Sequence, residues 1–340
     1  MTVASPKLRR PGRKLGEMEY THVGHLGLVV SRLCLGTMNF GPHTPEPDSY
    51  SIMDSAVAYG INFFDTANVF GRHLGVGATE EIIGRWFTKG DRRRDKVVLA
   101  TKVYGTMGDW PNESRLSKLG IVRQCEESLR RLRTDRIDLY QMHHIDRQSW
   151  WDEIWEAMEQ LKRQGKVLYV GSSNFAGWHI ARANEIAGWR NTLGLVSEQS
   201  PYNLMQRSVE LEVIPAIQEY GMGLIAYSPL AGGLLAGALE KVNEGRRSQG
   251  YMVGEIESNR PKLDQWETLC KELGHRPADV ALAWLLHQPA VTAPVIGPRT
   301  EAQLLGSMWA LGIEMSEEVL GKLDEIFPGP GGPAPEAYAW

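Results

Sequence analysis

The chain has 340 residues, 42% hydrophobic and 23% charged, and its 37 basic and 41 acidic residues give a formal net charge of -4. This length can bury a large core, and the charge balance gives no excess that would favour nucleic acid or an anionic bilayer as a partner. The cysteines Cys34, Cys125 and Cys270 are odd in number and far apart, which argues against a disulfide framework or a CxxC metal site and favours a cytoplasmic protein.

The N-terminal end of the chain contains two different segments. Residues 1–17 are basic and lack the apolar stretch of a signal peptide, so they predict a flexible tail. The next run, MEYTHVGHLGLVV from Met18, alternates around two glycines and predicts a small β-hairpin. Nowhere does the chain approach the roughly 18 consecutive apolar residues of a membrane-spanning helix.

After this hairpin, short apolar runs alternate with longer amphipathic segments. The predicted strands are RLCLG, INFFD, KVVLATK, IDLYQMHH, VLYVGSSN, GLVSEQ, GLIAYSP and TAPVIG. Helices are predicted near residues 48–59, 79–87, 121–132, 150–163 and 177–187. Eight strands mostly followed by helices, with no GxGxxG after the first strand, predict one α/β domain. We expect a (β/α)8 barrel over residues 18–327, plugged at its bottom by the N-terminal hairpin.

Three other segments carry local expectations. Thr79 precedes Glu80 and Glu81, so its hydroxyl is predicted to cap a helix whose positive end the carboxylates favour. Residues 231–260 are glycine-rich and then charged without a clear period, which predicts a long loop after the seventh strand that covers a ligand. Residues 328–340 are rich in proline and glycine and predict an extended or disordered tail without a helix.

Basic, aromatic and histidine residues also occur outside the predicted strand ends. The run Arg92 to Arg94 is predicted to be a solvated turn at the bottom of the barrel. The helical spacing of Trp151 and Trp155 indicates a packed face, whereas Trp110, after the third strand, is a candidate for the pocket wall. The nine histidines show no HExxH or comparable spacing, so no metal is predicted.

Three apolar runs end in ionisable groups, Asp65, Lys102 and His143. The carboxyl ends of the strands of a (β/α)8 barrel lie on one face, so strands two, three and four would bring these groups together. A lysine paired with an aspartate can lower the pKa of a nearby hydroxyl and position an imidazole. The alternative is that each is an isolated strand-end charge in contact with solvent.

The motifs at the strand ends, in order, are similar to those of the aldo-keto reductase family. They are LGTMNFG, INFFDTANVFG, the EEIIG of the second helix, VLATKV, DLYQMH, GSSNF, EQSPYNL, YSPLAGGLL and VIGPRT. The resemblance runs from about Met18 to Leu323. It implies an NADP(H)-dependent oxidoreductase acting on carbonyl compounds.

The family resemblance also implies a catalytic tetrad of Asp, Tyr, Lys and His. Asp65, Lys102 and His143 occupy three of these places, but Phe70 stands where the family has its tyrosine acid. A positioned general acid contributes about 10²- to 10⁴-fold in rate, so its loss need not abolish turnover. Either His143 or Tyr104, two residues beyond Lys102, could supply the missing donor.

The resemblance implies ten cofactor-binding residues at the ends of the last four strands. They are Ser173, Asn174, Gln199, Tyr227, Ser228, Leu230, Gly232, Gly297, Arg299 and Gln303. The first three would hold the nicotinamide carboxamide, the tyrosine would stack on the ring, and the small residues after it would approach the pyrophosphate. The guanidinium of Arg299, just before a helix, would bind the 2′-phosphate, which favours NADP over NAD. Ser307 stands where relatives commonly place an asparagine on the adenine.

The predicted function is therefore the NADPH-dependent reduction of a polar carbonyl compound. The motifs most resemble those of sugar-modifying bacterial reductases, which implies a nucleotide-linked keto-deoxysugar as the substrate. Loop residues Arg72, His73, His144 and Arg147 could meet its hydroxyls or phosphates, or could be solvated charges. The alternative, favoured by Phe70, is a cofactor-binding module with little turnover, like the channel-associated β subunits that resemble this family. The expected partner is a small molecule, without nucleic acid or membrane, and a homo-oligomer is left open.

Overall fold

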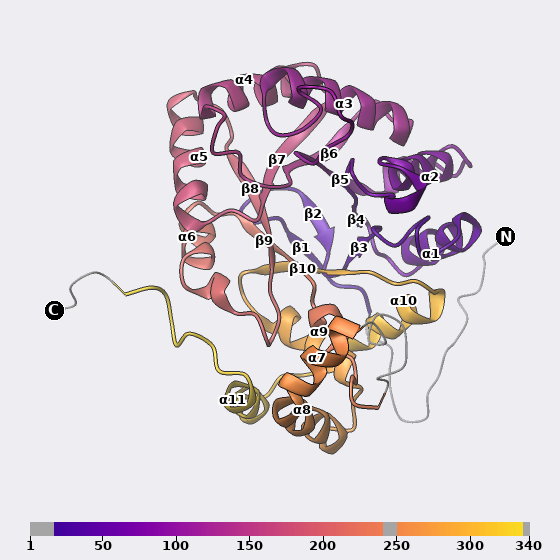
Figure 1. The fold of residues 1–340 in the computed structure, drawn as a ribbon, viewed down its shortest axis with the longest axis vertical. Coiled ribbons are helices and arrows are strands. Elements are labelled where there is room, and N and C mark those ends of the chain that lie inside the picture. The colour runs from indigo at the N-terminus through magenta and orange to yellow at the C-terminus, as the bar shows by residue number, and fades with distance from the viewer. Residues whose placement is uncertain (1–16, 241–249, 336–340) are drawn as a thin grey trace.

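Eight parallel strands close into one barrel in the computed structural model, which describes residues 17–240 and 250–335. Their order is β10-β3-β4-β5-β6-β7-β8-β9, so the predicted (β/α)8 fold is confirmed (Figure 1). The strands are β3 Cys34–Gly36, β4 Phe63–Asp65, β5 Val98–Val103, β6 Ile137–Met142, β7 Val167–Ser173, β8 Leu195–Pro201, β9 Gly223–Tyr227 and β10 Val291–Ile296.

Helices surround the barrel and cover the outer face of its strands (Figure 1). They are α1 Glu46–Ala58, α2 Ala78–Phe87, α3 Lys118–Leu132, α4 Trp151–Arg163, α5 Gly177–Trp189, α6 Val213–Glu219, α7 Gly250–Ser258, α8 Arg260–Glu272, α9 Pro277–His287, α10 Glu301–Ser307 and α11 Glu317–Ile326. The first five overlap the five helices predicted from periodicity. Among the described residues, no helix is long and apolar enough to cross a membrane.

The N-terminal hairpin closes the bottom of the barrel, as predicted. Its strands, β1 (Tyr20–His22) and β2 (Val29–Ser31), pair antiparallel. Val23 and Val30 are fully buried and pack in one cluster with inward-facing barrel residues such as Phe63, the first residue of β4. The hairpin thus excludes water from that end and leaves the carboxyl ends of the strands as the open face.

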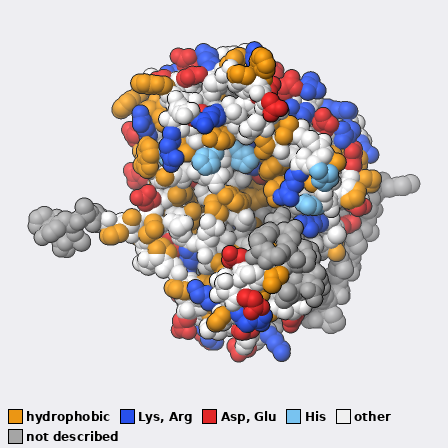
Figure 2. Space-filling view, in the orientation of Figure 1, with side chains coloured by type: hydrophobic (Ala, Val, Ile, Leu, Met, Phe, Trp, Pro, Cys, Tyr) orange, Lys and Arg blue, Asp and Glu red, His pale blue; other side chains and the backbone are white. Residues whose placement is uncertain are grey.

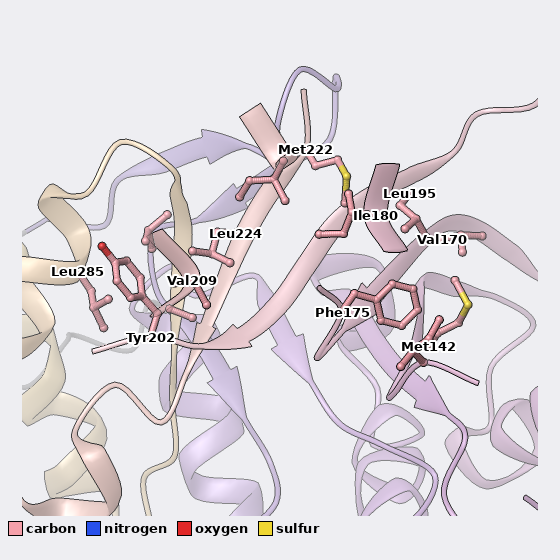
Figure 3. Packing of buried hydrophobic residues seen from close by; sticks show 14 of the residues in the cluster. Met142, Val170, Phe175, Ile180, Leu195, Tyr202, Val209, Met222, Leu224 and Leu285 are labelled. Carbon is pink, nitrogen blue, oxygen red and sulfur yellow. The ribbon is translucent and has the colours of Figure 1, made fainter. Parts of the chain in front are cut away.

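Buried apolar side chains fill the layer between strands and helices. Figure 3 shows part of this layer around β7, β8 and β9, with Val170, Leu195 and Ile180 close to Phe175. The expected packed face of α4 is confirmed, because Trp151 and Trp155 are 8% and 0% exposed. Strands covered on both faces read as continuous apolar runs, which is why these strands were recognisable.

The predicted cap at Thr79 is wrong. Helix α2 begins at Ala78 after Gly77, whose φ of 86° lies in the left-handed region, and no side chain caps it. The Thr79 side chain is buried instead, and its hydroxyl donates to the Phe40 carbonyl at 3.0 Å. Glycine supplies the left-handed conformation at low cost, so the helix can start one residue before the expected hydroxyl.

The prediction of a loop over residues 231–260 is also wrong in its second part. Helix α7 occupies residues 250–258, and its residues Met252 and Ile256 are 5% and 1% exposed. Residues four apart share a helix face, so these two side chains anchor the helix on the core. Glycines at 250 and 254 hide this period in the sequence. Residues 241–249 of the predicted loop lie outside the described residues.

The basic run before β5 is mostly not a solvated turn. Only the Arg92 side chain is largely exposed, at 85%. Arg93 and Arg94 are 16% and 12% exposed and form ion pairs with Asp54 and Asp138. The apolar stems of arginines can cover apolar surface while the guanidinium groups pair with carboxylates. Asp54 and Asp138 lie about 40 residues from their partners along the chain, so the local sequence does not reveal these ion pairs.

The two predicted tails fall largely at the edges of the described chain. Residues 1–16 and 336–340 lie outside the described residues, so only Glu17 of the N-terminal tail is described. Residues 328–335 contain no helix or strand, in agreement with their proline and glycine content.

Candidate active site

A cavity of about 640 Å³ opens at the carboxyl ends of the strands. It is lined by all fourteen residues proposed from the sequence, which are Asp65, Phe70, Lys102, His143, Ser173, Asn174, Gln199, Tyr227, Ser228, Leu230, Gly232, Gly297, Arg299 and Gln303. Figure 2 looks onto this hollowed face, where histidine side chains lie on the rim. The topology therefore gathers these residues at one site, and their roles stay predictions.

The alternation of side chains along the strands explains why ionisable groups enter the barrel. Ala100 and Leu139 are fully buried in the cluster inside the barrel, and their strands pair at these positions. Lys102 and Gln141 pair two residues further along, so they face the same interior one layer higher. Asp65 ends the neighbouring strand beside Ala100. The polar layer is thus the last layer of the barrel core.

Asp65 and Lys102 form a buried ion pair. The Lys102 ammonium donates to Asp65 Oδ1 at 2.8 Å, to Oδ2 at 2.6 Å and to the Thr66 carbonyl at 2.9 Å. Asp65 Oδ1 also accepts from the amides of Gln141 at 3.1 Å and Gln199 at 2.9 Å. The two charged residues are 3% and 1% exposed. Burial of charge is costly unless each group is paired and hydrogen-bonded, and both conditions hold here.

The aromatic ring of Phe70 stands beside this ion pair. The Lys102 ammonium lies 5.4 Å from the centre of the Phe70 ring, and the His143 ring meets that ring edge-on with centroids 6.1 Å apart. Burial, with Lys102 and then His144 adding repulsion, lowers the pKa of His143 to about 3. The imidazole is therefore neutral at physiological pH and carries one N–H donor.

A hydrogen-bonded wall joins the ends of four strands on the opposite side. The Ser173 hydroxyl donates to the Gln199 carbonyl at 2.8 Å, and the Asn174 amide donates to the His143 carbonyl at 3.1 Å. The Tyr227 hydroxyl donates to Asn174 Oδ1 at 2.8 Å. The positive φ of Asn174, 61°, turns the chain sharply after β7. These bonds fix the candidate nicotinamide-binding groups before any ligand arrives.

Glu198 lies behind this wall and was missed by the sequence reasoning. It is completely buried and accepts hydrogen bonds from the Ser172 hydroxyl, from the Ser200 hydroxyl at 2.7 Å and from the Phe175 N–H at 3.0 Å. Burial raises its pKa to about 7. An acid inside the predicted strand GLVSEQ was the available signal. Glu198 holds the turn that presents Asn174.

Two further residues complete the far end of the cavity and were not singled out from the sequence. Asn39 donates from its amide to the Gly297 carbonyl at 2.9 Å. Arg276, at the start of α9, lines the cavity beside Gly306 of α10. On the same helix, Gln303 Oε1 accepts from the Arg299 N–H at 2.8 Å. This end is therefore built from three separate segments, of which only the one around Arg276 carries no family-like motif.

Several predicted neighbours lie outside the lining of the described cavity. The Tyr104 ring packs on His144, with centroids 5.4 Å apart, so the structure favours His143 over Tyr104 as the hydrogen-bond donor. The prediction that Trp110 forms a pocket wall is wrong, because this side chain is 78% exposed. The Trp110 N–H donates to the Glu113 carboxylate at 3.0 Å, which folds the loop on itself rather than over the cavity.

The described residues contain no cluster of three or more His, Cys, Asp or Glu side chains that could hold a metal ion. Cys34, Cys125 and Cys270 are buried and unbridged.

Comparison with known proteins places the chain among reductases. The model of the aldo/keto reductase family matches residues 32–327. The "uncharacterized oxidoreductase YrpG" of Bacillus subtilis is 55% identical over 95% of this chain and 100% of its own length. A "probable voltage-gated potassium channel subunit beta" of Oryza sativa is 30% identical, covering 91% of this chain and 96% of its own. The "versiconal hemiacetal acetate reductase" of Aspergillus parasiticus is 30% identical, covering 91% and 97%.

Replacing His143 with glutamine should make stability less dependent on pH. The folded chain holds the pKa of His143 at about 3, below the 6.5 of an unperturbed imidazole, so the unfolded state binds a proton first as pH falls. The stability contribution is present above about pH 6.5 and is lost toward pH 3, by up to ~1.4 kcal/mol per pH unit. Urea unfolding of both proteins at pH 7.5 and 5 measures this difference. Parallel losses of stability in the two proteins would contradict the neutral imidazole.

Proposed function

Because the chain belongs to the aldo/keto reductase family, we propose that it is an NADPH-dependent oxidoreductase that reduces a polar carbonyl compound. The observation that carries this proposal is the single cavity that joins the buried Asp65–Lys102 pair to His143 and to the polar wall. A reductase needs such a place, where charge that develops on a carbonyl oxygen meets fixed donors away from water.

The lining residues fit a nicotinamide dinucleotide. Asn39 lines the cavity, and its buried Oδ1 has no hydrogen-bond partner among the described residues, so it can accept from a ligand. The amide of Asn174 and the hydroxyl of Ser173 match the donors and acceptors of a carboxamide. Gly232 and Gly233, with φ of 68° and 115°, let the loop after β9 approach a pyrophosphate without side chains. NADPH, when bound, would supply the hydride.

Proton delivery is the unusual step in this chain. As hydride reaches the carbonyl carbon, the π electrons move to oxygen, and an alkoxide develops that requires donors and finally a proton. The neutral imidazole of His143 donates a hydrogen bond to that oxygen, and the Lys102 ammonium stabilises its charge. Phe70 has no proton to give. We therefore assign the final proton to a water molecule that reaches the oxygen beside His143, and the hydroxide that remains would pass to bulk solvent.

The proposed substrate is a nucleotide-linked keto-deoxysugar, on the strength of motifs that resemble those of sugar-modifying bacterial reductases. Exposed basic and histidine side chains support a substrate with hydroxyls or phosphates. Arg72 Nη1 lies 3.1 Å from His43 Nε2 in an exposed contact, although neither residue lines the cavity. A second candidate function, a cofactor-binding module with little turnover, is favoured by Phe70 and by the similarity to a channel β subunit.

Turnover separates the two functions. If the chain is a reductase, NADPH should be consumed continuously in the presence of keto-sugar nucleotides, and these should react better than small aromatic aldehydes. Absorbance at 340 nm, with direct titration of NADPH binding in parallel, measures both properties. Tight binding without consumption on the whole panel would favour the binding module. Faster turnover of the aromatic aldehydes would remove the sugar assignment alone.

Arg299 should determine the preference for NADPH. Its guanidinium can form charge-assisted hydrogen bonds that only the 2′-phosphate accepts, so the native chain should bind NADPH more tightly than NADH. Arg299→Ala should abolish most of this preference, whereas Arg163→Ala, in an exposed side chain of α4, should leave it intact. Fluorescence titration with both cofactors gives the ratio of Kd values. Equal Kd values in the native chain would exclude this assignment.

Phe70→Tyr should raise kcat/KM on small carbonyls. The new phenol would stand near the Lys102 ammonium, which lies 5.4 Å from the present ring, and a positive neighbour lowers the pKa of a phenol. A positioned acid contributes roughly 10²- to 10⁴-fold in rate. Phe70→Leu is the matched control, because it changes the ring without adding a proton donor. No gain in the tyrosine variant, with NADPH affinity intact, would show that proton delivery does not depend on position 70.

A further inference from the structure

The guanidinium of Arg276 is fixed in one orientation at the far end of the cavity. Its Nε donates to Asp279 Oδ2 at 2.8 Å, and its Nη2 donates to Asp279 Oδ1 at 2.5 Å and to the Gly306 carbonyl at 2.8 Å. The Asp279 side chain is 1% exposed, whereas that of Arg276 is 39% exposed. The carboxylate is thus buried beneath a guanidinium that stays accessible from the cavity.

This arrangement decides what Arg276 can offer a ligand. The printed bonds engage three of the five N–H donors of the guanidinium, and the adjacent carboxylate compensates its charge. A phosphate would require in-plane donors and an uncompensated charge. An aromatic base requires only a flat, weakly hydrated cation against its face. Arg276 keeps available the two N–H groups of Nη1 and its planar face, and because Asp279 compensates its charge, an aromatic base fits it better than a phosphate.

Helix α10, which lies beside Arg276, leaves space for the guanidinium and for a ligand in the cavity. Gln303, Gly306 and Ser307 of α10 lie three and four residues apart on one helix face, and all three line the cavity. A Cβ atom on Gly306 would lie 3.1 Å from Nη2 and 3.3 Å from Nη1 of Arg276. Glycine at this position therefore lets the guanidinium lie against α10, one helical turn beyond Gln303.

We propose that Arg276 is a cofactor-binding residue whose guanidinium stacks on the adenine of the bound dinucleotide. The inference rests on the proposed function, which puts the 2′-phosphate at Arg299 and hence the adenosine at this end of the cavity. It gives the two arginines different roles. Arg299 distinguishes NADPH from NADH, whereas Arg276 contributes equally to the binding of both, because both carry the same base.

Arg276→Lys tests the stacking, because lysine keeps a cation beside Asp279 but loses the planar group. The Kd values of NADPH and NADH should rise by a similar factor, about 3- to 30-fold, so their ratio should not change. Reduced nicotinamide mononucleotide, which lacks the adenine, should bind both proteins equally. Isothermal titration calorimetry on the full chain measures all three ligands.

Two other variants keep the test independent of folding. Gly306→Ala should displace the guanidinium without removing it and should weaken both dinucleotides in the same direction. Arg190→Lys is the matched control, since Arg190 makes a similar paired contact, 2.7 and 3.1 Å to Glu159, outside the cavity lining. Its Kd values should equal those of the native chain.

Each remaining outcome has a defined meaning. A loss in Arg276→Lys confined to NADPH would overturn stacking in favour of a phosphate contact. Unchanged affinity for both dinucleotides would overturn any role of Arg276, and an equal loss for the mononucleotide would reveal a disturbance of the whole site instead of lost stacking. A native chain that binds neither dinucleotide would overturn the proposed function and this inference with it, which distinguishes that failure from the others.

Discussion

The buried ion pair between Asp65 and Lys102 is the constraint on which the rest of the site depends. Two charges with 3% and 1% exposure are tolerable only if every lone pair and proton finds a partner. The partners come from β4, β6 and β8, so the pair forms only when the barrel has closed around it. Because Gln199 is held by Asp65, the pair also fixes one of the groups of the proposed nicotinamide site. The charge and the geometry of that proposed site are thus set by the same network.

Phe70 supplies no proton donor to this network, and it does not interrupt the hydrogen bonds that hold Asp65 and Lys102 in place. An aromatic face toward an ammonium is itself stabilising, so the site loses a proton donor and keeps its electrostatics. The neighbouring imidazole cannot compensate as an acid, because burial and the same ammonium keep it neutral. Lys102 therefore has two opposed effects in the proposed reaction: it would stabilise negative charge on a substrate, and it adds to the burial that lowers the pKa of His143.

The sequence was sufficient for the barrel and for the residues at the ends of its strands, since both follow from period-two alternation between buried layers and from family-like motifs. It failed where partners are distant along the chain. Arg93 and Arg94 look like a solvated run until Asp54 and Asp138 are brought beside them. The sequence around Thr79 predicts a helix cap because Phe40, whose carbonyl accepts the hydrogen bond from the Thr79 hydroxyl, is 39 residues away along the chain. Arg276 carries no motif at all, and only the contact with Gly306 reveals it.

The two ends of the cavity are built on different physical principles. At the catalytic end the side chains are almost fully buried and share hydrogen bonds, so a substitution there disturbs several neighbours at once and its effects do not add. At the far end Arg276 and Arg299 stand on separate segments, and Arg276 is tied to a single carboxylate. Changes there can act on cofactor affinity one group at a time. The proposed cofactor preference would therefore change by single substitutions, whereas the proposed chemistry would change only where a side chain contacts the network without belonging to it. Phe70, which touches Lys102 and His143 only through its ring, is such a position.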